Sequence, residues 1–183
     1  MPRNIEIKAR LDNIAAVEPL VAALATAGPT LIVQDDSFFT CAQGRLKLRR
    51  FADGSAELIA YQRPDQAGPK TSTYVRTPVA DPASMAEALA AACGRLGRVQ
   101  KHRTLYLAGR TRVHLDEVQG LGPFLELEVV LADGEPEAAG VAEAEAWMAR
   151  LGLARSALVE PAYLDLLAEL QTDLPATRPP RPV

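Results

Sequence analysis

The chain has 183 residues, of which 48% are hydrophobic and 23% are charged, and its formal net charge is −3. This length suits one domain with its own core, and the composition is too apolar for a disordered chain and too polar for a membrane protein. No stretch approaches the roughly 20 uncharged apolar residues of a spanning helix, the charged N-terminus predicts no signal peptide, and Cys41 and Cys93 lack metal-ligand spacing. A cytoplasmic protein without membrane contacts is expected.

Eight short segments alternate apolar and polar residues, which is the period of a β-strand with two different faces. In chain order they are residues 5–11, a less regular segment at 33–40, then 45–49, 58–63, 72–77, 99–107, 110–118 and 123–131. A proline- and glycine-rich turn at residues 64–69 separates two of them. The sequence therefore predicts a protein built mainly from β-strands.

Four helices are predicted in the gaps. A helical stripe of apolar residues follows Asn13, a suitable N-cap, and a second helix begins at Asp81 and Pro82. Two further helices are predicted over residues 135–151 and 160–170. We expect one domain over residues 1–171, because no internal repeat or linker divides it, and a disordered proline-rich tail over residues 172–183.

Charge is distributed unevenly along the chain. Residues 1–112 carry a balance of +6 and residues 113–183 a balance of −9. A basic first part in an acidic protein predicts a local anion site and argues against a nucleic-acid surface. Of the 20 cations only four are lysines, at Lys8, Lys47, Lys70 and Lys101. In an arginine-rich chain, a retained lysine can mark a place that needs a compact ammonium group.

The polar strand faces concentrate one sign of charge. Residues 45–49 place three cations on one face and two leucines on the other, whereas residues 123–131 alternate Glu126 and Glu128 with apolar residues. One interpretation is a solvated sheet surface with weak ion pairs between strands. The other is a closed sheet whose charged faces line a lumen while the apolar faces pack outward on helices. Many cations beside a few carboxylates would suit a triphosphate with a divalent metal.

Five segments together resemble one family. They are Asn4-Ile5-Glu6-Ile7-Lys8, the cationic residues 45–49, residues 63–74 with Arg63 and Lys70, residues 101–106, and His114 to Glu128 with its Gly-Leu-Gly-Pro-Phe turn. In this order they resemble the CYTH superfamily, also called triphosphate tunnel metalloenzymes. The superfamily includes class IV adenylyl cyclases, thiamine triphosphatases and inorganic triphosphatases. The resemblance extends from Asn4 to about residue 167.

The resemblance implies an α+β fold in which eight antiparallel strands close into a tunnel with a charged lumen and flanking helices. It implies that Glu6, Glu126 and Glu128, with Asp116 nearby, hold Mg²⁺ or Mn²⁺, and that Lys8, Asp116 and Glu126 take part in the chemistry. The implied triphosphate-binding residues are Lys8, Arg45, Lys47, Arg49, Arg63, Lys70, Lys101, Arg103 and Arg112. The implied partner is a nucleoside triphosphate or another organic or inorganic triphosphate, bound by a monomer or a homodimer.

Asn4 departs from the family pattern, whose first motif is Glu-x-Glu-x-Lys. An amide supplies neither charge nor a base, so hydrolysis, which needs an activated water, is the activity that Asn4 disfavours. The leading expectation is therefore conversion of ATP to cyclic AMP and pyrophosphate. The alternatives are an inorganic or thiamine triphosphatase, and a binder of nucleotides or polyphosphate without catalytic activity.

Other residues have a structural and a functional interpretation. His114 can be a general base, but a hydrogen-bonding role behind the site is the simpler expectation. Tyr61, Tyr74 and Tyr106 can stack on a base, although packing is expected more often for such residues. Trp147 is expected in the core.

Overall fold

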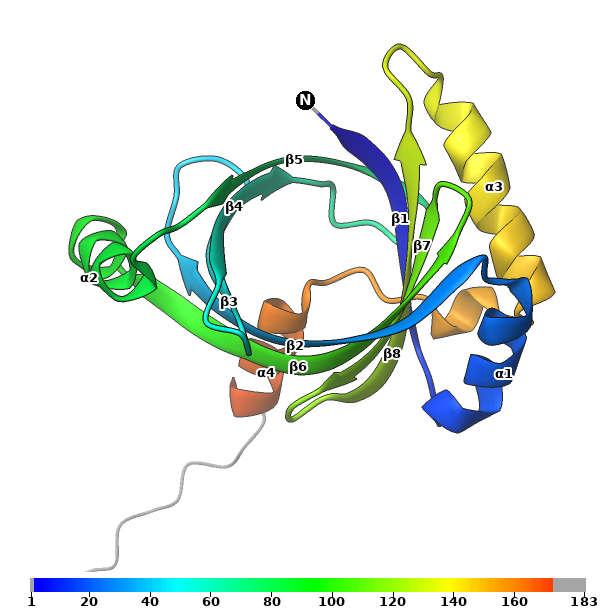
Figure 1. Cartoon of the computed structure of the whole chain (residues 1–183), viewed down its shortest axis with the longest axis horizontal. Coiled ribbons are helices and arrows are strands. Elements are labelled where there is room, and N and C mark those ends of the chain that lie inside the picture. Colours follow the sequence, from blue (N-terminus) through cyan, green and yellow to red (C-terminus); the bar gives the residue numbers. More distant parts are fainter. Residues whose placement is uncertain (1, 173–183) are drawn as a thin grey trace, which may run out of the picture.

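The computed structural model describes residues 2–172 (Figure 1). The tail that the sequence predicts therefore lies, from residue 173 onward, outside the described residues. The segment before it is helical up to Thr172.

Eight antiparallel strands form a closed barrel (Figure 1). Around the barrel they follow the order β1-β5-β4-β3-β2-β6-β7-β8, which puts β1 and β2 on opposite walls. The bounds are β1 Arg3–Arg10, β2 Ala27–Phe39, β3 Arg45–Phe51, β4 Ala56–Gln62, β5 Lys70–Pro78, β6 Arg95–Ala108, β7 Thr111–Val118 and β8 Gly122–Leu131. The predicted eight-stranded antiparallel barrel is confirmed.

Strands β2 and β6 are longer than the sequence pattern predicts. β2 begins at Ala27 and not at residue 33, and it pairs with β6 as far back as Leu107. Gly28 and Pro29, which locally favour a turn, lie inside this extension. Gly28 has a φ of +111°, and a Cβ there would lie 2.7 Å from the carbonyl oxygen of Leu105. Pairing with β6 thus overrides the local signal, because only glycine lets the two backbones approach so closely.

Four helices flank the barrel, as predicted, with a short 3₁₀ turn at Arg155–Ala157 before the last. They are α1 Ile14–Leu24, α2 Pro82–Cys93, α3 Glu137–Arg150 and α4 Tyr163–Thr172. Asn13 caps α1 by accepting a hydrogen bond from the backbone N–H of Ala15, and Asp81 caps α2 in the same way. No helix within residues 2–172 combines the length and apolar character needed to cross a bilayer.

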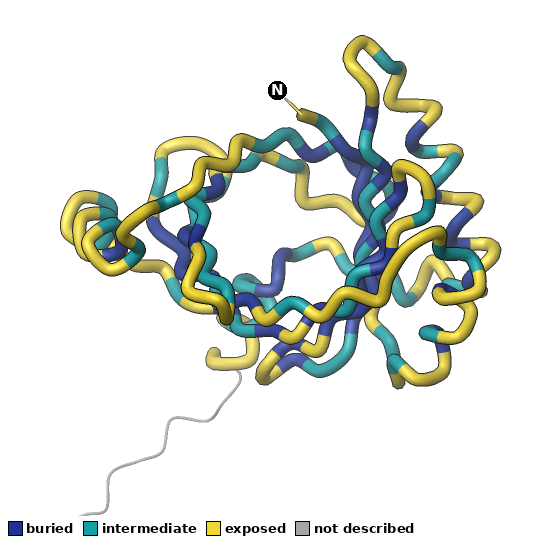
Figure 2. Tube along the Cα trace, viewed as in Figure 1, coloured by how far each residue is buried: buried dark blue, intermediate teal, exposed yellow. Residues whose placement is uncertain are grey.

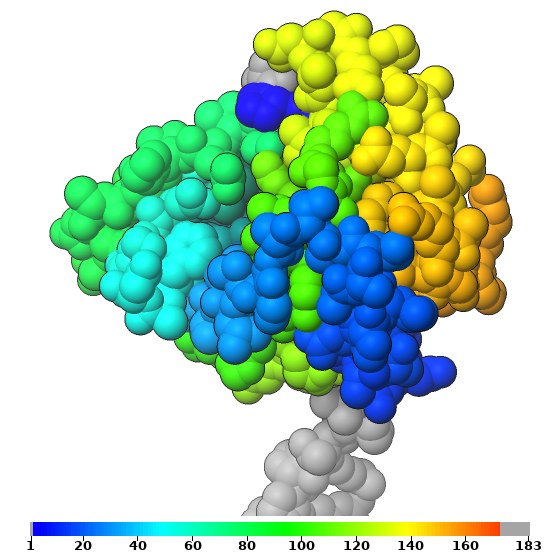
Figure 3. Space-filling model, turned by 45° about the vertical axis from the view of Figure 1, so that its right-hand side comes forward, coloured from blue at the N-terminus to red at the C-terminus, as the bar shows by residue number. Residues whose placement is uncertain are grey.

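The hydrophobic core lies outside the barrel. Helices α1 and α3 cover the strand faces that carry Ile7, Val113 and Leu127, all without exposed surface (Figure 2). Figure 3 shows these two helices together on one flank of the molecule. Phe39 and Leu48 pack similarly under α2. On β1, β7 and β8 the apolar residues therefore face the helices, which leaves the alternate residues for the interior.

The outer core supplies the first prediction. Leu127→Ala removes a fully buried side chain from the cluster under α1 and α3, and should lower the free energy of unfolding by about 2–5 kcal/mol. Leu31→Ala is the matched control, because Leu31 is 81% exposed and the same truncation there should cost within ~0.5 kcal/mol. Urea unfolding measures both. Equal losses would contradict a core placed outside the barrel.

Candidate active site

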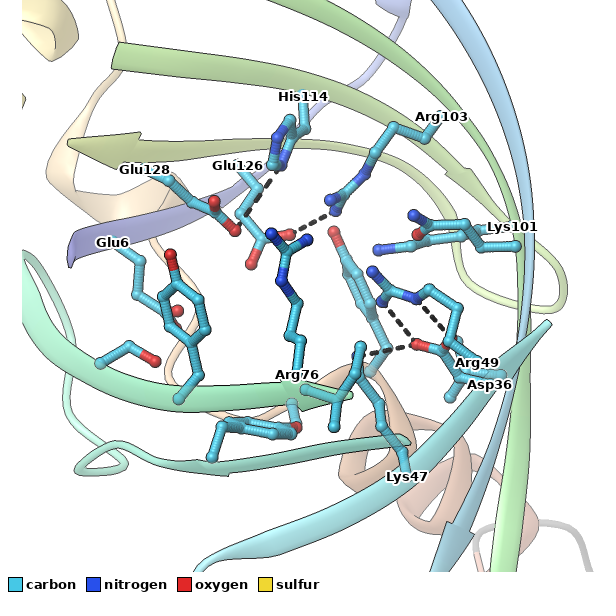
Figure 4. A pocket seen from close by; sticks show the side chains of 18 of the residues that line it. Glu6, Asp36, Lys47, Arg49, Arg76, Lys101, Arg103, His114, Glu126 and Glu128 are labelled. Atoms are coloured by element: carbon cyan, nitrogen blue, oxygen red, sulfur yellow. Dashed lines mark hydrogen bonds and ion pairs between the residues drawn. The ribbon is translucent and has the colours of Figure 1, made fainter. Parts of the chain in front are cut away.

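A cavity of about 330 Å³ is lined by residues from all eight strands and from the start of α4 (Figure 4). Its walls differ in charge. Carboxylates from β1 and β8 lie on one side, and cations from β3 and β6 lie on the other. Strands β1 and β8 are neighbours around the barrel, and β2 lies between β3 and β6. The carboxylates therefore come from one continuous wall, and the cations from another.

Most of the predicted site residues meet in this cavity. The acidic ones are Glu6, Glu126 and Glu128, and the basic ones are Lys8, Lys47, Arg49, Arg63, Lys101, Arg103 and Arg112. Three predicted residues, Arg45, Lys70 and Asp116, do not line it.

Arg45 and Lys70 contact other parts of the chain. Arg45 forms ion pairs with Asp165 of α4 at 2.8 Å and with Asp65 at 3.1 Å, and it lines a second pocket at the end of the barrel near α4. The ammonium of Lys70 donates to the backbone carbonyls of residues 66 and 160. Both cations therefore hold loops and α4 in this structure.

Asp36 lies among the cations of β3 and β6, which we call the cationic wall, and the sequence pattern did not point to it. Lys47 donates to its carboxylate at 2.8 Å, and Arg49 donates to both of its oxygens at 2.7 Å. Burial alone would raise the pKa of Asp36, but the two cations outweigh it and hold this pKa well below its usual value. Burial and the adjacent Arg49 lower the pKa of Lys47 to about 8. Asp36 thus fixes two predicted phosphate-binding side chains in place.

Asp116 has the same function for a second pair of cations. It has no exposed surface and accepts hydrogen bonds from Lys101 at 2.9 Å and from Arg103 at 2.6 and 2.7 Å. The hydroxyl of Tyr163, from α4, donates to the same carboxylate at 3.0 Å. The Tyr163 ring also lies 4.1 Å from the ammonium of Lys8. Asp116 therefore orients cations from behind the cavity.

Three glutamates form the acidic wall. Each contacts an arginine: Glu6 contacts Arg63 at 3.0 Å, Glu126 contacts Arg103 at 2.7 Å, and Glu128 contacts Arg112 at 3.2 Å. Burial and repulsion by Glu126 raise the pKa of Glu6, and Arg63 opposes this shift only in part. An added cation would stabilise the ionised form of a carboxylate that its neighbours repel.

The chemistry of these donors suits a hard divalent ion. Carboxylate oxygens are the ligands that Mg²⁺ and Mn²⁺ prefer, and the hydrogen bonds from Arg103 and Arg112 engage one oxygen each of Glu126 and Glu128. Within residues 2–172, no group of three or more Asp, Glu, His or Cys side chains is already arranged to hold a metal ion. A metal would therefore require these side chains to turn toward one another.

Several side chains of the cavity are not apparent from the sequence pattern. Asp36 lies in the least regular predicted strand, and Tyr163 lies in the helix predicted over residues 160–170. Arg76 also lines the cavity, although the pattern of residues 72–77 singled it out in no way. Of the three tyrosines considered for stacking, Tyr61 and Tyr74 line the cavity, whereas Tyr106 packs under α1 and donates to Glu18. The pair of acidic residues at positions 35 and 36, shortly before the cationic segment 45–49, was the one signal in the sequence that pointed to Asp36.

Three buried polar atoms that lack a hydrogen-bond partner within residues 2–172 all belong to residues that line the cavity. They are Oδ1 of Asn4, Oε1 of Gln34 and Nδ1 of His114. Burial, together with the positive charge of Arg103, lowers the pKa of His114 to about 4, so its imidazole is neutral at pH 7. Asn4 shares the inward face with Glu6, as the alternation of β1 predicted.

The fold and the site define a class of protein, and comparison with known proteins agrees. The family model of the CYTH domain matches residues 2–163, and the chain belongs to this family. A search of curated proteins gave no match.

Solved structures share the fold. The PH1012 protein of Pyrococcus horikoshii aligns with a TM-score of 0.80 and 22% identity, over 89% of this chain and 98% of that one. A "putative adenylate cyclase" from Vibrio parahaemolyticus aligns with a TM-score of 0.73 and 18% identity, over 90% and 97%. HpAC1 from Hippeastrum, described as having a dominant triphosphatase activity, gives a TM-score of 0.64 and 18% identity, over 92% and 96%.

Two neighbouring aspartates supply a test of the paired charges. Asp36→Asn leaves Lys47 and Arg49 buried without their anion, and should lower the free energy of unfolding by about 3–5 kcal/mol. Asp35→Asn is the matched control. Its partner Arg98 has a 57% exposed side chain, and such surface pairs contribute at most about 1 kcal/mol. Urea unfolding compares them, and similar losses would contradict the inward position of Asp36.

The same variant should change the response to acid. Because the pKa of Asp36 is lowered on folding, the unfolded chain binds protons more readily, and the stability that this group contributes is present above about pH 5 and lost on acidification. Asp36→Asn should therefore lose less stability than the natural protein between about pH 5 and pH 3. An equally steep loss of stability on acidification in both proteins would show that other carboxylates cause this loss.

Proposed function

We propose that the protein binds a nucleoside triphosphate in the cavity and, with a divalent metal, converts it to a cyclic nucleotide and pyrophosphate. The single observation that carries this proposal is the cavity itself, in which oriented cations face a wall of three glutamates. Its family membership supports a triphosphate substrate, because the superfamily that its motifs resemble acts on triphosphates. The fold of the solved structures is consistent with this assignment.

The cationic wall is suited to phosphoryl oxygens. Lys47, Arg49, Lys101 and Arg103 are already oriented by buried aspartates, so little ordering remains when an anion binds. Charge-assisted hydrogen bonds to phosphate are about twice as strong as neutral ones. Fixed cations also stabilise the charge that develops on the transferred phosphoryl group.

The three side chains predicted to take part in the chemistry divide into two groups. Lys8 and Glu126 line the cavity and can contact a substrate. Asp116 has no exposed surface, so we assign it to positioning Lys101 and Arg103. Glu6, Glu126 and Glu128 would hold Mg²⁺ or Mn²⁺, which neutralises phosphate charge when bound.

Asn4 favours cyclisation over hydrolysis. In cyclisation the oxygen of the ribose 3′-hydroxyl forms a bond to the α-phosphorus, the bond from that phosphorus to the bridging oxygen breaks, and pyrophosphate leaves with the proton that the hydroxyl gives up. No water has to be activated. Asn4 stands beside Glu6 on the inward face, and its amide cannot act as the base that orients a water molecule.

A triphosphatase is the second candidate. The description of HpAC1 as having a dominant triphosphatase activity favours it, because that protein shares the fold. Product analysis after incubation with ATP, tripolyphosphate and thiamine triphosphate, each with Mg²⁺ or Mn²⁺, separates the candidates. Cyclic AMP supports the cyclase, and orthophosphate supports the triphosphatase. Tight binding without any product would show that the protein only binds its ligand.

The acidic wall is tested by Glu126→Gln with Glu128→Gln. The double variant should lose metal-dependent turnover, because the amides lack the charge that attracts a divalent ion. Binding of tripolyphosphate without metal, measured by calorimetry, should persist, since the cationic wall is unchanged. Glu117→Gln on the adjacent strand β7 is the control, because Glu117 is exposed. Full turnover in the double variant would remove these glutamates from the metal site.

Asn4 is tested by adding the charge that the family motif carries. Asn4→Glu should increase orthophosphate release from tripolyphosphate, because a general base contributes roughly 10²–10⁴ in rate. Asn4→Gln is the matched control, which lengthens the side chain and adds no charge. Rapid orthophosphate release by the natural protein, with no gain in Asn4→Glu, would show that Asn4 does not limit hydrolysis.

A further inference from the structure

Gln34 has a side chain that the triphosphate site leaves without a role. It lies on β2 and is only 4% exposed, and its Oε1 is among the unpartnered atoms of the cavity. Buried side-chain polar atoms almost always have a hydrogen-bond partner, and an exception calls for an explanation such as a missing ligand. An uncharged amide is also a weak ligand for phosphate compared with the cations beside it. Gln34 is therefore suited to an uncharged polar group.

The strands around Gln34 change in character along the barrel. Near α4, Phe38 of β2 and Val99 of β6 pack with Tyr163. Next come the charged residues of the cationic wall, which include Asp36 two positions before Phe38. Gln34 lies two positions before Asp36 and further from α4. It is paired across the sheet with Phe51 on β3 and Lys101 on β6. The amide thus lies at the outer edge of the cations.

Beyond Gln34 the same wall becomes apolar. Ile32, Phe51 and Leu105 all line the cavity, and all three are only partly buried. Ile32 pairs with Arg103 and lies diagonally to Leu105 on the adjacent strand β6. These four side chains, Ile32, Gln34, Phe51 and Leu105, form what we call the β2 mouth: an apolar surface with one unpartnered amide.

The opposite wall at this end carries planar groups. Tyr74 and Arg76 of β5 line the cavity, and the guanidinium of Arg76 lies 5.8 Å from the Tyr74 ring centre. Figure 4 shows Arg76 extending into the cavity. A flat molecule between the two walls would contact apolar side chains on one face and a guanidinium or phenol on the other. Base stacking on such groups is favourable and requires no charge on the base.

We propose that the β2 mouth is a base-recognition subsite, which holds the planar heteroaromatic group of an organic triphosphate whose phosphates lie on the cationic wall. A cavity of about 330 Å³ falls in the ~300–1,000 Å³ range of pockets that enclose an organic ligand. The Gln34 amide presents a donor and an acceptor side by side, the pair that matches N6 and N7 of adenine. Gln34 is thus the specificity-determining residue and adenine the preferred base. This inference rests on the proposed function, since it assumes a triphosphate on the cationic wall.

Two ligands with the same phosphates separate the base from the triphosphate. Binding of ATP and of ribose 5-triphosphate is measured by calorimetry in EDTA, so that no turnover occurs. The natural protein should bind ATP at least about tenfold more tightly, which is the effect of one stacked base. Gln34→Met keeps the length of the side chain and removes the amide, so this ratio should fall by several-fold while the affinity for ribose 5-triphosphate stays the same.

Control variants make the result specific. Gln100→Met changes a glutamine on β6 that pairs with Asp35 and does not line the cavity, and its ratio should equal that of the natural protein. Phe51→Leu removes the aromatic face without touching a charge and should also lower the ratio. This variant keeps the test valid if Gln34→Met fails to fold.

Each outcome decides the proposal. Equal affinity for the two ligands in the natural protein would overturn the base subsite and leave the proposed triphosphate site intact. An unchanged ratio in Gln34→Met and Phe51→Leu would place the base elsewhere and also overturn it. If neither ligand binds, the proposed function and this inference both fail. A preference for GTP over ATP would contradict the assignment of adenine to Gln34.

Discussion

Two buried aspartates each hold a pair of cations inside the barrel, and the rest of the structure depends on this pairing. A charge taken out of water costs several kcal/mol unless an opposite charge and hydrogen bonds compensate it. Asp36 compensates Lys47 and Arg49, and Asp116 compensates Lys101 and Arg103. The cations are therefore held in place without a ligand, which is the condition for binding an anion with little rearrangement.

Where charged residues face the interior, the alternating apolar residues of the same strand face outward. Strand β1 shows the consequence, because six successive residues from Asn4 to Ala9 are buried. The even-numbered ones line the cavity, whereas Ile5 and Ile7 pack under α3 and α1. A shift of one residue in its pairing would place charges against the helices and leucine-like side chains in the cavity. The same alternation thus fixes both the register of the barrel and the composition of the site.

The segment that leads into α4 gives the cavity a direction. Backbone carbonyls of residues 160 and 161 accept hydrogen bonds from Lys70 and Lys8, and Tyr163 follows at once. Cations near this end are thus engaged by the protein chain, while Ile32, Phe51 and Leu105 of the β2 mouth at the other end are apolar and only partly buried. A triphosphate with an organic group has the same polarity, charged at one end and apolar at the other. This correspondence connects the fold to the kind of substrate that we propose.

The sequence by itself determined the alternation of the strands, the four helices and the family. Period-two patterns showed which residues share a face, and so Glu126 with Glu128, or Lys47 with Arg49, could be grouped in advance. The sequence could not show which strands lie side by side and so which side chains share a wall of the cavity. That depends on the strand order, in which β2 lies between β3 and β6. For that reason Asp36 was missed as the partner of Lys47, and the contacts of Arg45 and Lys70 with α4 and nearby loops were not foreseen.

Tyr163 lies 47 positions from Asp116 in the chain, and no local pattern encodes a contact between residues so far apart. Only the tertiary structure decided it, by packing the last helix against the end of the barrel.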